Sequence, residues 1–69
     1  MRRLPVDSSG IASIGYSRRS QVLEVEFQSG RIYQYLDVAA GIFDELMSSP
    51  SQGTYFNAHV RDHYPFLRM

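Results

Sequence analysis

The amino-acid sequence predicts an α+β domain in which a three-stranded antiparallel meander is covered by two short C-terminal helices. Its first half alternates apolar and polar residues, which is the period of a half-buried strand. Its second half repeats apolar residues at about every fourth position, which is the period of an amphipathic helix. The two patterns meet near Asp37. With 69 residues the chain is long enough for one domain, which we place at residues 1–69 with a core of about 8–65.

Three runs in the first half predict the strands. Ile11–Tyr16 is the first, and the polar turn Ser17–Ser20 follows it. Val22–Phe27 has the clearest pattern, because its apolar residues alternate with two glutamates. Arg31–Leu36 resumes the alternation after a short break that contains Gly30, and two strands separated by such a break form an antiparallel hairpin.

The length of the hairpin loop decides which face of the sheet carries Tyr33 and Tyr35. A two-residue loop would place both rings beside the glutamates on the solvent-facing side. A three-residue loop, Gln28–Gly30, would instead pair Tyr33 with Val25 and Tyr35 with Leu23. We predict the three-residue loop, because its last position needs a positive φ and is occupied by glycine.

The second half predicts two helices that pack on the sheet. Asp37 is placed to cap a helix over about Val38–Met47, and the turn Ser48–Gly53 ends it. Thr54 is placed to cap a second helix that stops at Pro65. The expected core draws on both halves of the chain and consists of Ile14, Leu23, Val25, Phe27, Ile42, Leu46, Phe56 and Val60.

Composition and charge argue for a binding module rather than an enzyme. Seven cations, all arginine, balance seven anions, so no net field attracts a polyanion. Without cysteine there is no thiolate chemistry, and no serine has a plausible histidine and carboxylate partner. We therefore expect no catalysis and no cofactor. No apolar run approaches the roughly 20 residues of a membrane span, so we expect no membrane association and a cytoplasmic location.

The central run Leu23-x-Val25-x-Phe27-x-x-Gly30-x-x-Tyr33-x-Tyr35 is similar to the centre of the KTSC domain. The upstream Ile14-Gly15-Tyr16 and the downstream Ser51-x-Gly53-x-Tyr55-Phe56-Asn57 with Tyr64 resemble the same family, so the likeness covers about Ser8–Pro65. The resemblance implies a short bacterial domain of unestablished activity, found alone or at the C-terminus of some lysyl-tRNA synthetases. It also implies that RNA, including tRNA, is the partner to consider first.

A second resemblance is partial. The run Val22–Tyr33 is similar to the first motif of Sm-like proteins, which bind RNA on rings of small barrels. The second Sm motif is missing, and the chain turns helical where such a barrel supplies further strands. This resemblance therefore implies at most an atypical Sm-like sheet.

The candidate nucleic-acid-binding residues are aromatic, cationic or amide side chains on the hairpin and the second helix: Arg18, Arg19, Arg31, Tyr33, Tyr35 and Asn57. On an open sheet face the two tyrosines would stack bases, each worth about 1–3 kcal/mol, and in the predicted register they pack in the core instead. The arginines of the two turns are expected about 20 Å apart, either solvated or spanned by one RNA strand. Asn57 is placed either to support the Thr54 cap or to bind a phosphate.

His59 and His63 are four residues apart, a spacing that can hold a metal ion, but no third ligand is evident, so we expect no metal site. The sequence is compatible with two classes of function. One is a nucleic-acid-binding module for tRNA or single-stranded RNA. The other is a protein-interaction module or homo-oligomer that uses an exposed sheet edge.

Overall fold

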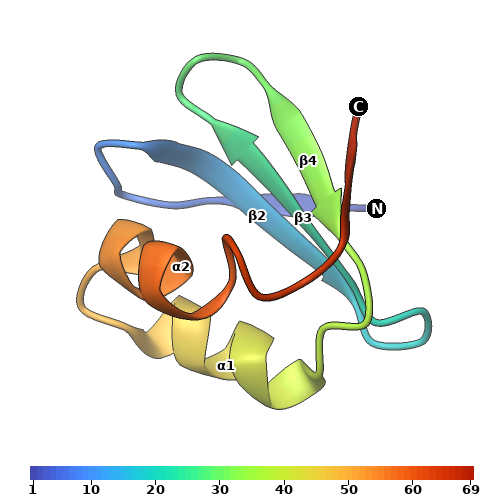
Figure 1. Cartoon of the computed structure of the whole chain (residues 1–69). Helices are drawn as coiled ribbons and strands as arrows, with labels where there is room; N and C mark the ends of the chain where they lie inside the picture. Colours follow the sequence, from blue (N-terminus) through green and yellow to red (C-terminus); the bar gives the residue numbers. More distant parts are fainter.

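The sheet is an antiparallel meander whose strands lie side by side in sequence order, with both helices inserted before its last strand (Figure 1). The computed structural model describes residues 1–69. Its elements are β1 (Arg3–Pro5), β2 (Ile11–Ser17), β3 (Val22–Phe27), β4 (Ile32–Tyr35), α1 (Ala40–Ser48), α2 (Gln52–His59) and β5 (Phe66–Arg68). The predicted α+β class is confirmed, but the sheet has five strands instead of three.

The two strands that the sequence pattern did not predict are the edges of the sheet. β1 and β5 have three residues each, which is too short for a period-two pattern to be visible. Both are held by pairing with a longer neighbour. β5 is tied to β4 by hydrogen bonds from the Leu36 amide to the Pro65 carbonyl and from the Met69 amide to the Ile32 carbonyl, both at 2.8 Å.

The predicted register of the β3–β4 hairpin is confirmed. Leu23 pairs with Tyr35 and Val25 with Tyr33. The Phe27 carbonyl accepts from the Gly30 amide, and the Phe27 amide donates to the Arg31 carbonyl, both at 2.9 Å. Gly30 has a φ of 94°, so the three-residue loop closes through the conformation that glycine adopts without strain.

The predicted start of the first helix is wrong. Asp37 has a φ of 61° and so lies outside the helix, which begins at Ala40 without a side-chain cap. A short polar residue tolerates this left-handed conformation, and here it turns the chain beneath the sheet. Val38 follows it into the core, where its amide donates to the Gln21 carbonyl and its carbonyl accepts from the Tyr16 hydroxyl.

The predicted bounds of the second helix are also wrong. The Ser51 hydroxyl, not Thr54, caps α2, and it accepts from the Thr54 amide at 3.3 Å. Ser51 stands directly before the first helical residue, and serine is preferred over threonine at that position, whereas Thr54 lies within the first turn. The helix ends at His59, well before Pro65, which instead leads into β5.

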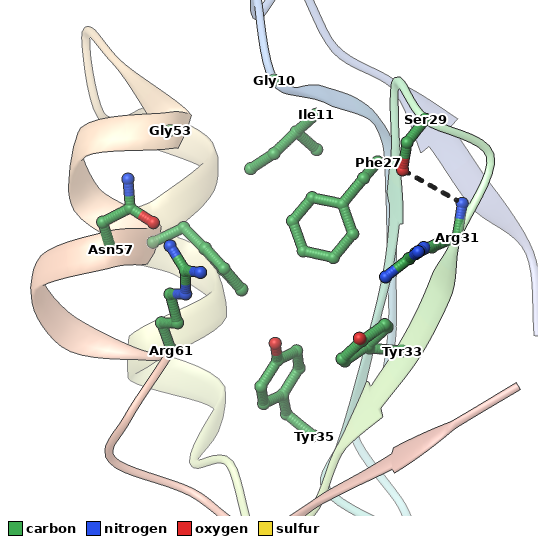
Figure 2. Close-up of a pocket in the computed structure, with 11 residues that line it drawn as sticks. Gly10, Ile11, Phe27, Ser29, Arg31, Tyr33, Tyr35, Gly53, Asn57 and Arg61 are labelled. Carbon is green, nitrogen blue, oxygen red and sulfur yellow. Dashed lines mark hydrogen bonds between the residues drawn. The ribbon is translucent and has the colours of Figure 1, made fainter.

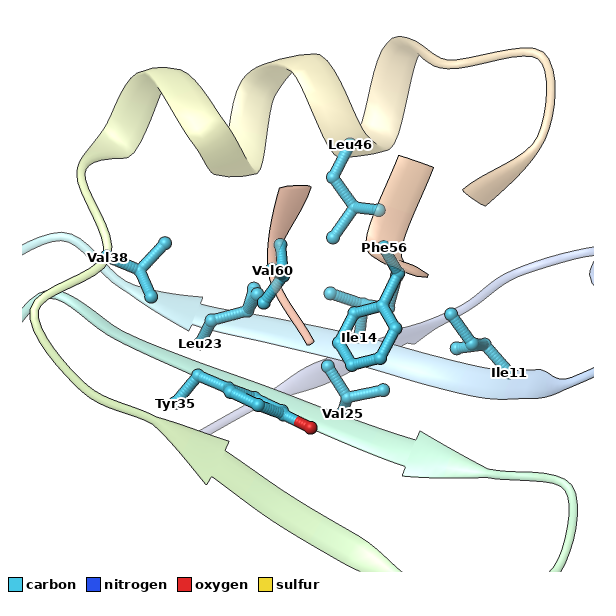
Figure 3. Packing of buried hydrophobic residues seen from close by; sticks show 9 residues of the cluster. All are labelled: Ile11, Ile14, Leu23, Val25, Tyr35, Val38, Leu46, Phe56 and Val60. Atoms are coloured by element: carbon cyan, nitrogen blue, oxygen red, sulfur yellow. The ribbon is translucent and has the colours of Figure 1, made fainter. Parts of the chain in front are cut away.

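The core lies between the inner face of the sheet and the two helices (Figure 3). Its buried members are Ile11, Ile14, Leu23, Val25, Tyr35, Val38, Leu46, Phe56 and Val60. Phe27 and Ile42, which were expected in the core, are only partly buried and pack against it. Val38 joins the core from the connection before α1, because the turn at Asp37 points it inward.

The outer face of the sheet carries a polar cluster that holds β1 in place. Glu24 is 7% exposed, forms an ion pair with Arg3 and accepts from the Gln34 amide at 2.8 Å. Arg3 reaches across Gly15, where an added Cβ would lie 2.7 Å from the Arg2 carbonyl oxygen. Only glycine therefore permits this close approach of β1 to β2.

The charge on Glu24 makes stability depend on acid pH. Burial alone would raise the pKa of this carboxyl, but hydrogen bonds from Gln34 and Arg3 and the Arg3 charge outweigh it and lower the pKa below 4.5. The folded state therefore binds this proton more weakly than the unfolded chain does. The stabilisation is present above pH 4.5 and is lost as the pH falls through the lowered pKa.

We predict that Glu24→Gln lowers the free energy of unfolding by about 1.5 kcal/mol at pH 7, because it removes charge-assisted hydrogen bonds. The difference from the parent should shrink as the pH falls below 4.5. Urea unfolding between about pH 2 and 7 measures it. The control is Asp44→Asn, which breaks the exposed ion pair with Arg18 and should cost about 0.2–1 kcal/mol. A Glu24→Gln deficit that is the same at every pH would contradict the assignment.

Candidate functional site

A cleft of about 350 Å³ opens between α2 and the β3–β4 hairpin (Figure 2). Its floor and walls are apolar or aromatic, and its rim is polar. The apolar residues are Ile11, Phe27, Tyr33, Tyr35 and Phe56, and the polar or small residues are Gly10, Ser29, Arg31, Gly53, Asn57 and Arg61. An apolar cleft with a few converging polar groups is the usual form of a ligand site.

Two arginines from different elements enter the cleft from opposite sides (Figure 2). Arg31 directly follows the loop that Gly30 closes, so the hairpin register determines its position. Arg61 follows the last turn of α2, where its amide donates to the Phe56 carbonyl at 3.0 Å. Neither guanidinium forms an ion pair or a side-chain hydrogen bond within the protein. Both are therefore available to an anionic ligand.

The aromatic wall is built by packing between rings. The Tyr33 ring stacks on Phe66 with centroids 5.3 Å apart and lies 6.3 Å from Tyr35. The Phe27 ring meets Tyr33 and Phe56 edge to face. Since neighbours cover much of the tyrosine rings, the half-buried Phe27 and the exposed part of Tyr33 supply the aromatic surface of the cleft.

Tyr35 contributes a hydroxyl rather than a ring face. The residue is 3% exposed, and its hydroxyl points into the cleft (Figure 2). The hydroxyl forms no hydrogen bond within the protein, and since no buried polar side-chain atom is left without a partner, it is open to solvent in the cleft. Burial raises the pKa of this phenol, and the neighbouring Tyr33 raises it further. The group therefore stays protonated at neutral pH and can donate a hydrogen bond to a ligand.

The structure brings Arg31, Tyr33, Tyr35 and Asn57 together in this cleft. It does not bring Arg18 and Arg19 to it. They lie in the turn between β2 and β3, where Arg18 pairs with Asp44 at 3.0 Å and covers the Phe43 ring. The Asn57 side chain is exposed and has no part in the Ser51 cap, so its amide faces both the cleft and solvent.

Sequence reasoning missed Arg61 and the role of Phe27. Arg61 belongs to no motif, but it is four residues after Asn57, a spacing that places two side chains on one side of a helix. That spacing is the sequence signal that could have placed Arg61 beside Asn57. His59 and His63, whose spacing could hold a metal ion but which we expected to form no metal site, do not line the cleft. His59 packs on the Tyr55 ring with centroids 4.4 Å apart. The structure contains no group of three metal-ligating side chains, and neither helix is long and apolar enough to cross a membrane.

We predict that Tyr35→Phe leaves the melting temperature unchanged within about 1–2 °C, because the lost hydroxyl is open to solvent in the cleft and forms no hydrogen bond within the protein. The matched control is Tyr16→Phe, which removes a hydroxyl that donates to the Val38 carbonyl and should cost about 0.5–1.5 kcal/mol. Thermal unfolding of both variants measures the difference. Equal losses would show that the Tyr35 hydroxyl supports the fold instead of facing a ligand.

Comparisons with known proteins agree with the KTSC resemblance of the sequence. The model of the KTSC domain family matches residues 7–64. The chain is 37% identical over 70 residues to a protein of Stutzerimonas stutzeri (strain A1501), covering 100% of this chain and 99% of the relative. It is 32% identical over 66 residues to a lysine–tRNA ligase of Nostoc punctiforme, covering 96% of this chain but only 12% of the ligase. No comparison tests the Sm-like likeness of the hairpin, which stays a prediction.

The fold is also that of a solved relative. The crystal structure of a KTSC domain protein from Yersinia pestis superimposes with a TM-score of 0.94 at 35% sequence identity, covering 99% of this chain and 96% of the other. The match includes the edge strands and both helices, since nearly all of each chain is aligned. On its sequence, its strand and helix order and its structure, this chain belongs to the KTSC domain family.

Proposed function

We propose that this KTSC domain is a non-catalytic RNA-binding module that holds a single-stranded segment in the cleft between α2 and the β3–β4 hairpin. One observation carries the proposal: Arg31 and Arg61, from separate elements, both point into an apolar cleft and have no acidic partner. Guanidinium groups recognise phosphate oxygens through paired N–H donors, so a phosphate between the two arginines satisfies both.

The remaining groups of the cleft suit the rest of a nucleotide. A base placed against Phe27 and Tyr33 covers their exposed aromatic surface, and such stacking contributes about 1–3 kcal/mol per base. The Tyr35 hydroxyl and the Asn57 amide then lie where they can hydrogen-bond to the polar edge of that base. A flat apolar group joined to an anion is the ligand that uses all of these residues.

The charge distribution indicates that RNA is attracted by individual arginines of the cleft and not by the net charge of the domain. The net charge is zero, so the domain has no field that steers RNA from a distance. Among the seven arginines, Arg3 and Arg18 form ion pairs. Both cleft arginines keep an uncompensated charge, as do Arg2, Arg19 and Arg68 outside the cleft. We therefore expect modest affinity that depends on a few phosphate contacts.

The relatives support RNA as the class of ligand. Several are lysine–tRNA ligases, from Nostoc punctiforme, a Nostoc species and Trichormus variabilis, and their name says that they act on tRNA. The region similar to this chain is 12% of each ligase, so the activity of the whole enzyme does not carry over. Within this proposal the ligand is tRNA or another single-stranded RNA, and the domain works in the bacterial cytoplasm.

A second candidate function is protein interaction or self-assembly through the free edge of β5. β5 is an outer strand, and Phe66, Leu67 and Met69 beside that edge are 52%, 54% and 67% exposed. The opposite edge, β1, contains Pro5, which has no N–H to donate to another strand. An added strand would therefore pair with β5 rather than β1.

We predict that binding to mixed-sequence single-stranded RNA weakens with salt with a slope of log affinity against log salt of about −1.4, because two arginines neutralise phosphates. Arg31→Ala and Arg61→Ala should each weaken binding and make the slope shallower by about 0.7. Fluorescence anisotropy at several salt concentrations measures both quantities.

The control for this experiment is the double variant Arg18→Ala with Arg19→Ala, which removes two charges outside the cleft and should change the slope little. If RNA fails to bind even at the lowest salt while sedimentation shows a defined oligomer, the β5 edge is the functional surface and the RNA proposal is wrong.

A further inference from the structure

A second hollow of about 360 Å³ adjoins the cleft at the N-terminal end of α2. Residues 7–10 and 50–54 line it together with Asn57, and none of these residues is hydrophobic. Gly10, Gly53 and Asn57 line both hollows, so the two spaces share a border at these residues. Figure 2 shows Gly10 and Gly53 at one end of the cleft, away from Tyr35.

The backbone conformation at Gly10 and Gly53 does not require glycine. Positive φ among the glycines is confined to Gly30. Gly53 lies in the first turn of α2, where glycine is one of the poorest helix formers. Another residue type would be expected at both positions if only the local conformation mattered.

Packing does not require these glycines either. A Cβ at Gly10 would meet no heavy atom within 4 Å, and a Cβ at Gly53 would meet only the Ser8 hydroxyl at 3.5 Å, an ordinary contact. Gly15 differs, because its Cβ would collide with Arg2. What the missing side chains at Gly10 and Gly53 do provide is open space between the two hollows.

The chemistry of the second hollow differs from that of the cleft. It has hydroxyls, the two side-chain amides of Gln52 and Asn57, one carboxylate and no cation. The Asp7 carboxylate is exposed and forms no ion pair within the protein. A carboxylate disfavours a phosphate beside it but accepts hydrogen bonds from sugar hydroxyls, as acidic residues do in nucleotide-binding folds. The hollow therefore suits a ribose better than a second phosphate.

We propose that a bound RNA strand crosses between Gly10 and Gly53, with one nucleotide in the cleft and the ribose of the next in the polar hollow. This footprint of two nucleotides rests on the proposed function. It adds two properties that the cleft alone does not have: preference for a dinucleotide over a mononucleotide, and preference for ribose over deoxyribose, whose sugar lacks the 2′-hydroxyl donor.

The test uses Gly53→Gln, which places a long side chain at the border of the two hollows. The matched control is Gly41→Gln, an exposed glycine of α1 that has open space around its Cβ and lines neither hollow. Glutamine is a better helix former than glycine, so both variants should melt at or above the parent temperature. A loss of binding in Gly53→Gln then does not come from unfolding.

The probes are adenosine and uridine 5′-monophosphates and the 5′-phosphorylated dinucleotides pApA and pUpU, with their deoxy counterparts, measured by calorimetry. The parent and Gly41→Gln should bind the ribodinucleotides about ten-fold more tightly than the mononucleotides, since the second sugar adds hydrogen bonds. Gly53→Gln should lose this gain, so that it binds the ribodinucleotides no more tightly than it binds the mononucleotides. The deoxydinucleotides should show little gain in any of the three proteins.

The outcomes separate this inference from the proposed function. If mononucleotides and dinucleotides bind the parent equally, the inference is wrong and the cleft still binds RNA. Equal binding of ribo- and deoxydinucleotides would refute the ribose site. If no nucleotide or oligonucleotide binds the parent at all, the proposed function fails and this inference fails with it.

Discussion

Gly30 closes the β3–β4 loop with a φ of 94°, and this conformation determines which residues of the two strands face each other. In the observed register Leu23 and Val25 lie opposite Tyr35 and Tyr33 on the inner face, so the core receives apolar partners and the cleft receives a tyrosine hydroxyl. The same loop places Arg31 at the mouth of the cleft. A slip of one residue would turn Glu24 and Gln34 inward and would remove both the core and the site.

The elements around the hairpin keep that arrangement in place. On the outer face, Arg3 and Gln34 satisfy the buried Glu24, which attaches β1 to the sheet. On the inner face, Phe56 of α2 packs against Phe27 and Tyr35, with ring centroids 5.5 and 5.3 Å apart. α2 is therefore fixed to the hairpin by the residues that also form the floor of the cleft. The aromatic floor of the cleft is therefore positioned by the core itself.

Residue patterns predict the parts of this fold that have a local physical signal. The hairpin register follows from a glycine at the position that needs positive φ, and it was predicted correctly. β1 and β5 carry no such signal, because three residues cannot show a period and their pairing is tertiary. Asp37 was predicted as a helix cap, because aspartate is common at that position. In the structure it instead adopts a positive φ, which aspartate tolerates better than most residues. Arg61 joins the site through the packing of α2 on the sheet, which a single sequence does not show.

RNA binding in the cleft between α2 and the hairpin is the central proposal. Titration of isotopically labelled protein with single-stranded RNA, followed by amide and side-chain NMR shifts, tests it directly. If RNA binds in the cleft, the shifts concentrate at Phe27, Arg31, Tyr33, Asn57 and Arg61, and the turn that holds Arg18 and Arg19 is unaffected. Shifts confined to that turn or to the β5 edge would contradict it.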